Sequence, residues 1–412
     1  MSAENGVGRI PAAGRGAAAR LGRAANGAVA WLRKHVGTRQ LRFLVARWVL
    51  SPVPAWRRSA HAYWRASPAA ALGAEKLFER TFTGSFSLAG REAAFLRRYP
   101  AAAGALTADG RLRLSSTIRA DALADCEVLP LAPGVLHLPT ERMVLAAGRA
   151  FNPRTVRPFR YEAAAPAAGT VIPLLAAHYY HFVLDELRLV LRALADAPAL
   201  RTATLLVPTG VEPFREAACD ALARAYPGLE IRRIRKEQKV RCAAVAVLGR
   251  VPGTGMHDFA DGETIAAVAG LYRARYGIAP GVPRRRLFVS REAGRWDRGL
   301  LNEEEVFGAL RAHGFERIRP EAMDHAEQVR AFSEAAAVAG IAGAALTNLA
   351  FCPPGARVLE IRPDTFRNPI WIGLCKQLGL EHFAVEGRTR GSRGHLTVDA
   401  AEIRILAREL AG

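Results

Sequence analysis

The sequence predicts an α/β protein whose C-terminal part is an open, doubly wound sheet. Short apolar runs typical of strands alternate there with runs of helical period, four times between residues 284 and 387. Because a strand followed by a crossover helix returns parallel to its predecessor, such repeats build a parallel sheet with helices on both faces. A shorter alternation over residues 202–249 predicts a second sheet of the same kind.

Each apolar run of the C-terminal repeat predicts one strand, and each run of helical period predicts one helix. The strands are expected at residues 285–291, 315–320, 336–343, 357–363 and 380–387. The helices are expected at residues 302–314, 325–335, 346–355 and 368–379. In the earlier alternation, strands are expected at residues 202–210, 229–234 and 239–249, with a helix at residues 211–228. Gly314 ends the first C-terminal helix, and Pro227 with Gly228 closes the earlier one.

The length of 412 residues allows more than one domain. Composition divides the protein into a basic Ala/Arg-rich arm at residues 1–75 and two α/β domains at residues 76–270 and 271–412. In open parallel sheets, ligands bind beyond the carboxyl ends of the strands. Two such domains therefore predict a cleft between them, with the binding residues facing that cleft.

The N-terminal arm carries more than half of the protein's net charge of +20. Residues 1–70 contain twelve arginines and lysines but one acid, Glu4. This asymmetry predicts an anionic partner, either lipid head groups or nucleic acid. Bulky apolar residues between Trp31 and Trp56 favour an amphipathic helix on an anionic membrane, and a solvated arm is the alternative. Nucleic acid is disfavoured because the arm contains no recognition motif.

Cysteine usage and hydropathy predict a cytoplasmic protein. The five cysteines form no C-x-x-C pair, so neither a disulfide framework nor a zinc site is indicated. The most apolar stretch, residues 163–177, is too short to span a membrane and contains two prolines. The N-terminus lacks the pattern of a signal peptide. Through its arm, the protein could lie on the inner face of the plasma membrane.

The first candidate site is the glycine turn at residues 340–348. A predicted strand enters a turn with Gly340 and Gly343, and a helix begins near Leu346. Glycines let the backbone approach a ligand closely, and free N–H groups at a helix start attract phosphate. Thr347 and Asn348 could add side-chain hydrogen bonds. Such junctions are also common without any ligand.

Two further candidates stand at or after predicted C-terminal strands. The strand at residues 285–291 delivers Arg291 to its carboxyl end, where a guanidinium could clamp a diphosphate, and Arg298 follows in the loop. A solvated basic loop is the alternative. Glu360 lies near the end of the strand at residues 357–363, where a carboxylate could bind the hydroxyls of a ribose. An ion pair with Arg362 is the alternative for Glu360.

A fourth candidate lies on the predicted helix at residues 178–194. His181 and Asp185 are four residues apart and share a helix face, with His178 three residues before His181. A carboxylate beside a histidine fixes its tautomer and raises its basicity, as suits a general base. A buried, hydrogen-bonded histidine pair is the structural alternative. Metal ligation is disfavoured because no other His or Cys cluster accompanies these residues.

Taken together and in this order, the motifs resemble glycosyltransferase family 61, also called DUF563, of the bacterial polysaccharide-biosynthesis type. The resemblance covers residues 174–362. The matching segments are residues 179–187, 286–310 and 313–361. The family commonly has a histidine where this protein has Ala342, and an asparagine where it has His178.

The resemblance implies a GT-B-like fold, in which two Rossmann-type domains face a cleft. It also implies transfer from a nucleotide sugar, in the first place a UDP-sugar, with inversion at the anomeric carbon. The acceptor would be a glycan or glycolipid of cell-surface polysaccharide biosynthesis, such as capsule. Residues 76–270 would form the acceptor side and residues 271–412 the donor side. No Asp-x-Asp motif is present, which fits a transferase without a metal or other cofactor.

The resemblance also implies roles for individual residues. His181, oriented by Asp185, would be the catalytic base near the acceptor, with Glu186 as the second candidate. Glu360 would face the ribose or base of the donor. The donor diphosphate would lie against Arg291, Arg298, Gly343, Ala344, Leu346, Thr347 and Asn348.

Other functions remain open at this point. The protein could be a catalytically impaired relative that binds nucleotide sugars, or a nucleotide-sugar epimerase, which needs no acceptor. A hydrolase with a metal on His178, His181 and Asp185 is a third possibility. A non-enzymatic binding protein that uses the basic arm is a fourth.

Overall fold

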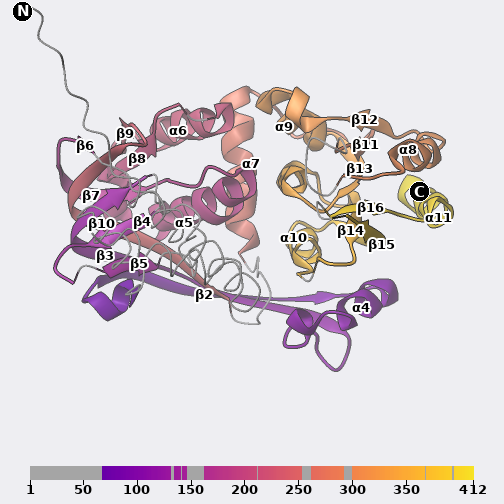
Figure 1. Ribbon diagram of the computed structural model, residues 1–412, viewed down its shortest axis with the longest axis horizontal. Helices are drawn as coiled ribbons and strands as arrows, with labels where there is room; N and C mark the ends of the chain where they lie inside the picture. Colours follow the sequence, from indigo (N-terminus) through magenta and orange to yellow (C-terminus); the bar gives the residue numbers. More distant parts are fainter. Residues whose placement is uncertain are drawn as a thin grey trace, which may run out of the picture.

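A computed structural model describes most of the protein after residue 66 (Figure 1). The described ranges are residues 67–130, 134–140, 142–145, 162–210, 212–252, 261–291, 299–366, 368–391 and 394–412. Nearly all of the predicted basic arm and Arg298 lie outside these ranges, so membrane binding by residues 1–70 stays a prediction. Within the described ranges, no helix is both long and apolar enough to cross a membrane.

The C-terminal sheet is doubly wound, as the sequence predicts. Its six strands lie in the order β12-β11-β13-β14-β15-β16. All pairs are parallel except the last, between β15 and β16. The strands are β11 (Arg285–Val289), β12 (Glu316–Ile318), β13 (Ala335–Ile341), β14 (Arg357–Pro363), β15 (Glu381–Arg390) and β16 (His395–Thr397).

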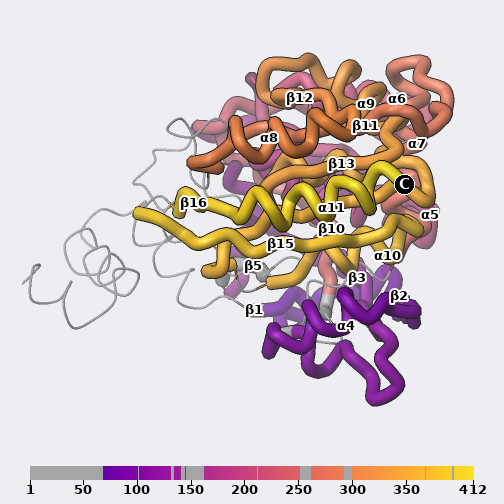
Figure 2. The backbone as a smooth tube through the Cα atoms, turned by 90° about the vertical axis from the view of Figure 1, so that its right-hand side faces the viewer, coloured from indigo at the N-terminus to yellow at the C-terminus, as the bar shows by residue number. Residues whose placement is uncertain are grey.

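Helices cover both faces of this sheet because its strands are apolar on both sides. Leu287 and Val338 belong to one buried cluster, whereas their strand neighbours Phe288 and Ala339 belong to another. One face packs α9 (His325–Ser333), the 3-10 helix η7 (Ala344–Phe351) and α10 (Ile370–Gln377). The other face packs α8 (Glu303–Arg311) and α11 (Ala400–Ala411), which lie side by side (Figure 2).

The first sheet is mixed, which differs from the purely parallel sheet expected from residues 202–249. Its main path is β1-β5-β4-β3-β10-β7-β8-β9, with β2 paired to β3 and β6 paired to β10. The predicted strands β8, β9 and β10 are parallel to one another through β7, which was not predicted, but β2, β4 and β10 run antiparallel to β3. Strands β2, β3 and β4 come from residues 67–145, and the largely alternating burial along β3 suits an antiparallel strand with one half-exposed face.

The strands of the first sheet are β1 (Ser67–Pro68), β2 (Glu75–Ser87), β3 (Arg111–Leu129), β4 (Gly134–His137), β5 (Arg142–Leu145), β6 (Glu162–Ala163), β7 (Ala167–Pro173), β8 (Thr204–Pro208), β9 (Glu230–Ile234) and β10 (Gln238–Pro252). The helices that follow its parallel strands are η4 (His181–Leu187), α5 (Arg188–Asp196), α6 (Pro213–Ala225) and α7 (Gly262–Tyr276). The predicted helix at residues 178–194 is thus two segments, and η4 is a π-helix. A π-helical segment inside a helix often marks a functional site.

A long hairpin connects the two sheets. We use this name for β2, α4 (Gly90–Arg97) and β3, which run from the first sheet beneath the second (Figure 1). At its tip, Phe95 and Leu114 share a buried cluster with Ile372 of α10. The Arg362 guanidinium of β14 lies 4.5 Å from the ring centre of Tyr99, which follows α4. The hairpin tip therefore packs against the second sheet.

The main hydrophobic core also spans both sheets. One cluster contains Leu205 of β8, Tyr272 of α7 and Val338 of β13, all fully buried. The predicted domain boundary after residue 270 falls within α7. The division of the protein into domains stays a prediction.

Candidate functional site

The C-terminal sheet has a topological switch point between β11 and β13. The backbone leaves β11 toward β12 on one side and continues from β13 toward β14 on the other. At such a point the connecting loops diverge and leave a crevice beyond the carboxyl ends of the strands, where ligands bind. Arg291 follows β11 and Gly343 follows β13, so two predicted donor-binding residues stand at this crevice.

Arg291 lies directly against the backbone of Gly343. A Cβ atom added to Gly343 would be 2.5 Å from Nη1 of Arg291. Gly343 has an extended φ of 178°, so the need for glycine is one of space and not of conformation. The Arg291 backbone N–H donates to Glu303 Oε2 at 3.4 Å, and the Ser290 hydroxyl donates to Glu303 Oε1 at 2.6 Å. The first turn of α8 therefore holds the residue that carries the guanidinium.

At the glycine turn, backbone N–H groups are more accessible to a ligand than side chains are. Ala344 and Ala345, which begin η7, are partly exposed. The first N–H groups of a helix have no partner within it and attract anions. By contrast, Leu346, Thr347 and Asn348 are fully buried. Leu346 packs in the core, and Thr347 Oγ1 has no hydrogen-bond partner among the described residues.

Both the oxygen and the nitrogen of the Asn348 side-chain amide form hydrogen bonds with other side chains. The Tyr179 hydroxyl donates to its Oδ1 at 2.6 Å, and its Nδ2 donates to Gln328 Oε1 at 3.0 Å. The Tyr179 hydroxyl also lies 2.9 Å from Nε2 of His325. Sequence reasoning assigned no role to Tyr179, Gln328 or His325, because their proximity arises only from the packing of three helices.

His181 and Asp185 form the predicted pair. His181 Nδ1 lies 2.8 Å from Asp185 Oδ2. The His181 side chain is 42% exposed, whereas that of Asp185 is 6% exposed. Oδ1 of Asp185 lies 3.9 Å from Nη2 of the buried Arg250. A buried carboxylate thus orients a solvent-accessible imidazole, which is the arrangement of a general base.

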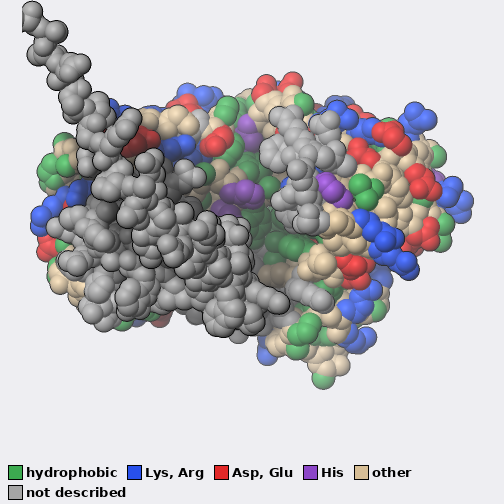
Figure 3. Space-filling view, in the orientation of Figure 1, with side chains coloured by type: hydrophobic (Ala, Val, Ile, Leu, Met, Phe, Trp, Pro, Cys, Tyr) green, Lys and Arg blue, Asp and Glu red, His purple; other side chains and the backbone are tan. Residues whose placement is uncertain are grey.

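This pair stands at the switch point of the first sheet. From β7 the backbone proceeds through β8 to β9 on one side, and then returns to β10 on the other side of β7. His181 and Asp185 follow β7, and Arg250 is close to the carboxyl end of β10. Each sheet therefore brings one of the two predicted groups to its own switch point. Figure 3 shows histidine side chains at a hollow in the middle of one face.

The carboxylates of Glu186, which is partly buried, and Glu360 both accept hydrogen bonds from other groups of the protein. Both oxygens of Glu186 accept the Ala176 N–H at 2.9 Å. Glu360 is fully buried in the middle of β14, where its Oε1 accepts from Arg362 at 3.0 Å. Its Oε2 lies 2.9 Å from His382 Nε2. The alternative ion pair with Arg362 is present, and the donor role of Glu360 stays a prediction.

The two positions where the sequence departs from the family pattern differ in exposure. Ala342 is fully buried, and its N–H donates to the Ile361 carbonyl at 2.8 Å. His178 is exposed, and its ring centre lies 5.2 Å from that of His181. Among the described residues, no group of three or more His, Cys, Asp or Glu is arranged to hold a metal ion.

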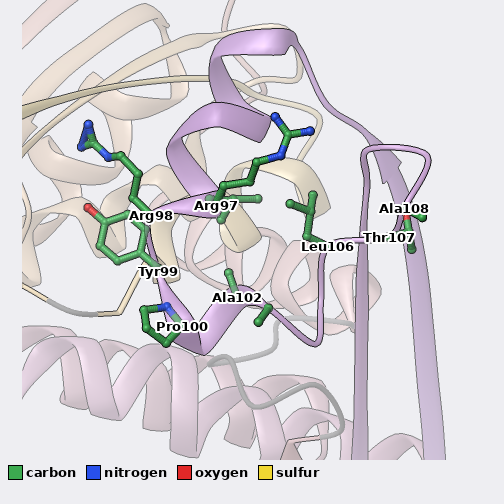
Figure 4. Close-up of a pocket in the computed structure, with 10 residues that line it drawn as sticks. Arg97, Arg98, Tyr99, Pro100, Ala102, Leu106, Thr107 and Ala108 are labelled. Carbon is green, nitrogen blue, oxygen red and sulfur yellow. The ribbon is translucent and has the colours of Figure 1, made fainter.

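A separate cavity of about 600 Å³ lies at the tip of the long hairpin (Figure 4). It is formed by residues 96–108, with Arg97, Arg98 and Tyr99 among its lining. None of the predicted site residues contributes to it. Its walls come from the hairpin alone, so we do not count it as part of the candidate site.

Comparison with known proteins gives one match to a family. Residues 179–359 match the family described as Glycosyltransferase 61. None of the curated proteins compared with this protein matches it. One similar solved structure is described as the metal soaked Flv1 flavodiiron core from Synechocystis sp. PCC6803, with 10% identity and a TM-score of 0.23. The likeness covers 53% of this protein and 50% of that one, and so distant a likeness says nothing about function.

Proposed function

Because residues 179–359 match the glycosyltransferase 61 family, we propose that this protein transfers a sugar from a nucleotide sugar to a glycan acceptor. The observation that carries the proposal is the contact of Arg291 with Gly343 at the switch point of the C-terminal sheet. We propose a UDP-sugar as the first donor to test. The acceptor is a glycan or glycolipid of cell-surface polysaccharide biosynthesis.

The donor diphosphate lies between Arg291 and the start of η7. A guanidinium fork binds phosphate oxygens through two parallel hydrogen bonds. The first N–H groups of η7 add donors from the opposite side of the crevice, and Gly343 leaves the space for close approach. Such donors neutralise a diphosphate without a metal ion, so we propose a metal-independent reaction.

His181 is the base in this proposal. Asp185 holds Nδ1, so Nε2 is the nitrogen that takes the proton from the acceptor hydroxyl. The acceptor oxygen then bonds to the anomeric carbon while the bond from that carbon to the diphosphate oxygen breaks. The proton ends on His181, and the negative charge ends on the nucleoside diphosphate beside Arg291. A single displacement of this kind inverts the anomeric carbon.

Ligand-induced thermal stabilisation tests the donor site. The protein is heated with a panel of nucleoside diphosphates and nucleotide sugars, with and without chelator. A ligand at 100 times its Kd should add about 2.7 kcal/mol to the free energy of unfolding. The proposal expects stabilisation by one nucleotide family that is unaffected by chelator and lost in Arg291→Ala.

Arg284→Ala is the matched control, because it removes the same charge beside the other end of β11. Arg284 pairs with Glu334 at 3.3 Å, but its side chain is 71% exposed, so its loss should cost little stability. No stabilisation of the wild type by any nucleotide would contradict the donor site. Stabilisation without sugar transfer to any acceptor would favour a relative that binds nucleotide sugars without catalysis.

A further inference from the structure

Four helical elements meet in one series of partly buried hydrogen bonds. Tyr276 at the end of α7 contacts Nδ1 of His325 at 2.8 Å, and Nε2 of His325 contacts Tyr179 at 2.9 Å. Tyr179 precedes η4 and continues the series to Asn348 of η7 at 2.6 Å. The last bond of the series runs from Asn348 Nδ2 to Oε1 of Gln328, in α9, at 3.0 Å.

The series has one consistent direction. Asn348 Oδ1 can only accept, so the single proton of the Tyr179 hydroxyl is donated to it. The Tyr179 oxygen must then accept from His325, which places the imidazole proton on Nε2. Nδ1 is therefore the acceptor for the Tyr276 hydroxyl. Burial lowers the pKa of His325 to about 4, and burial raises the pKa of Tyr276 to about 12, so both keep these protonation states near neutral pH.

Aromatic rings hold the imidazole in place. His325 is buried, with 6% of its surface exposed. Its ring centre lies 4.7 Å from that of Tyr272, 5.9 Å from that of Phe214 and 6.1 Å from that of Phe351. A ring enclosed in this way cannot turn without moving three elements. The hydrogen bond to Tyr179 is therefore a rigid connection.

We propose that Tyr179 and His325 are positioning residues that set the place of His181 relative to the donor turn. Tyr179 stands two residues before His181, and its partner Asn348 stands four residues after Ala344, the first residue of η7. That is about 8 Å along a 3-10 helix. The hydrogen bond thus joins the element with the base to the element whose start receives the diphosphate. The expected effects on kcat rest on the proposed function, because they require that the protein transfers a sugar.

Tyr179→Phe tests the inference because it removes one oxygen and keeps the ring. Placing a base about 1 Å away from its proper position can cost about 100-fold in rate. We expect kcat to fall by about 10- to 100-fold, while the donor Kd stays within about twofold of the wild type. The matched control is Tyr226→Phe at the end of α6, which should change neither value. A Tyr179→Phe enzyme with wild-type kcat would overturn the inference.

Combined variants separate positioning from general loss of structure. If Tyr179 acts through His181, then Tyr179→Phe should cause no further loss of turnover in a His181→Ala background. In an Arg291→Ala background, its effect should instead multiply with that of the arginine. Equal losses in both backgrounds would mean that Tyr179 has a general structural role.

Nuclear magnetic resonance of labelled histidines gives a readout that needs no activity. His325 should be neutral with its proton on Nε2 between about pH 5 and 8, given its low pKa, and Tyr179→Phe should shift the ring signals of His181. Unchanged His181 signals would overturn the inference whether or not transfer is observed. Wild-type protein that binds no nucleotide and transfers no sugar would contradict the proposed function instead.

Discussion

The hydroxyl of Tyr179 donates a hydrogen bond of 2.6 Å to Oδ1 of Asn348, across 169 positions of the sequence. This bond joins the segment that follows β7 in the first sheet to the helix that follows β13 in the second. The two switch points, one with His181 and one with Arg291, are thereby anchored on η7. The candidate site therefore depends on the relative position of the two sheets.

A methyl group at position 343 should weaken donor binding. Gly343→Ala places a Cβ atom 2.5 Å from Nη1 of Arg291, so the guanidinium must move away from the turn. We expect a loss of donor affinity of about tenfold or more, since one charge-assisted hydrogen bond contributes about 1.5–3 kcal/mol. Titration calorimetry with the stabilising nucleotide measures the change. Gly308→Ala on α8 has open space around its Cβ and should bind normally.

Removal of the imidazole should abolish transfer but spare donor binding. General base catalysis contributes about 100- to 10,000-fold to rate, so His181→Ala should lower kcat by about that factor. The donor Kd should not change, because Arg291 and η7 remain. The exposed neighbour His178→Ala is the control and should keep most of the activity. Steady-state kinetics with donor and acceptor measure both variants, and a His181→Ala enzyme of normal rate would exclude this base.

Glu360→Gln should act on stability and not on the donor. Arg362 would lose the carboxylate that neutralises it in a fully buried site, and breaking a buried pair costs about 3–5 kcal/mol. Urea unfolding measures this cost. The exposed Glu381→Gln, which removes a partner 3.6 Å from Arg357, should cost less than about 1 kcal/mol. A normal free energy of unfolding with a weakened donor affinity would instead support the ribose contact predicted from the sequence.

Stability should fall on mild acidification because of His325. Its pKa is about 4 in the folded protein, below the ordinary value of 6.5, because burial disfavours the charged ring. The unfolded protein therefore binds more protons between these two values, and the free energy of unfolding falls as pH drops from about 6.5 to about 4. The full effect of this group is about 3 kcal/mol. The nearby Asp324 partly opposes it.

Chemical unfolding at several pH values measures this slope. His325→Asn should flatten it, whereas Gly308→Ala on α8, which removes no titratable group, should leave it unchanged. An equally steep slope in His325→Asn would assign the acid sensitivity to other groups, since carboxylates also titrate in this range.

The C-terminal strands could be predicted from the sequence because each is an apolar run bounded by clear breaks. The observed β11, β13 and β14 closely match the predicted ranges. The pairing of His181 with Asp185 could also be predicted, since it needs only local helix geometry. Contacts between segments that are distant in the sequence could not be predicted. The burial of Thr347 and Asn348 depends on how α9 and η4 pack against η7, which periodicity does not reveal.

The long hairpin is the main feature that sequence patterns do not reveal. Its strands β2 and β3 are half-exposed, and their alternation is interrupted by polar and small residues, so no strong apolar run marks them. The partner of its tip lies near the C-terminus, in α10 and β15. Sequence patterns describe neighbours along the backbone, whereas this contact is set by the packing of the whole protein.

The same hairpin affects how the protein folds during its synthesis on the ribosome. Phe95, Leu96 and Leu114 are synthesised before their partner Ile372, which comes far later in the sequence. Until then, the tip exposes an apolar surface that can associate with other nascent polypeptides. A polypeptide that stops before α10 would keep this surface uncovered permanently. Termination between η7 and α10 should therefore yield aggregation-prone protein, even though every residue of the proposed catalytic pair and donor turn is present.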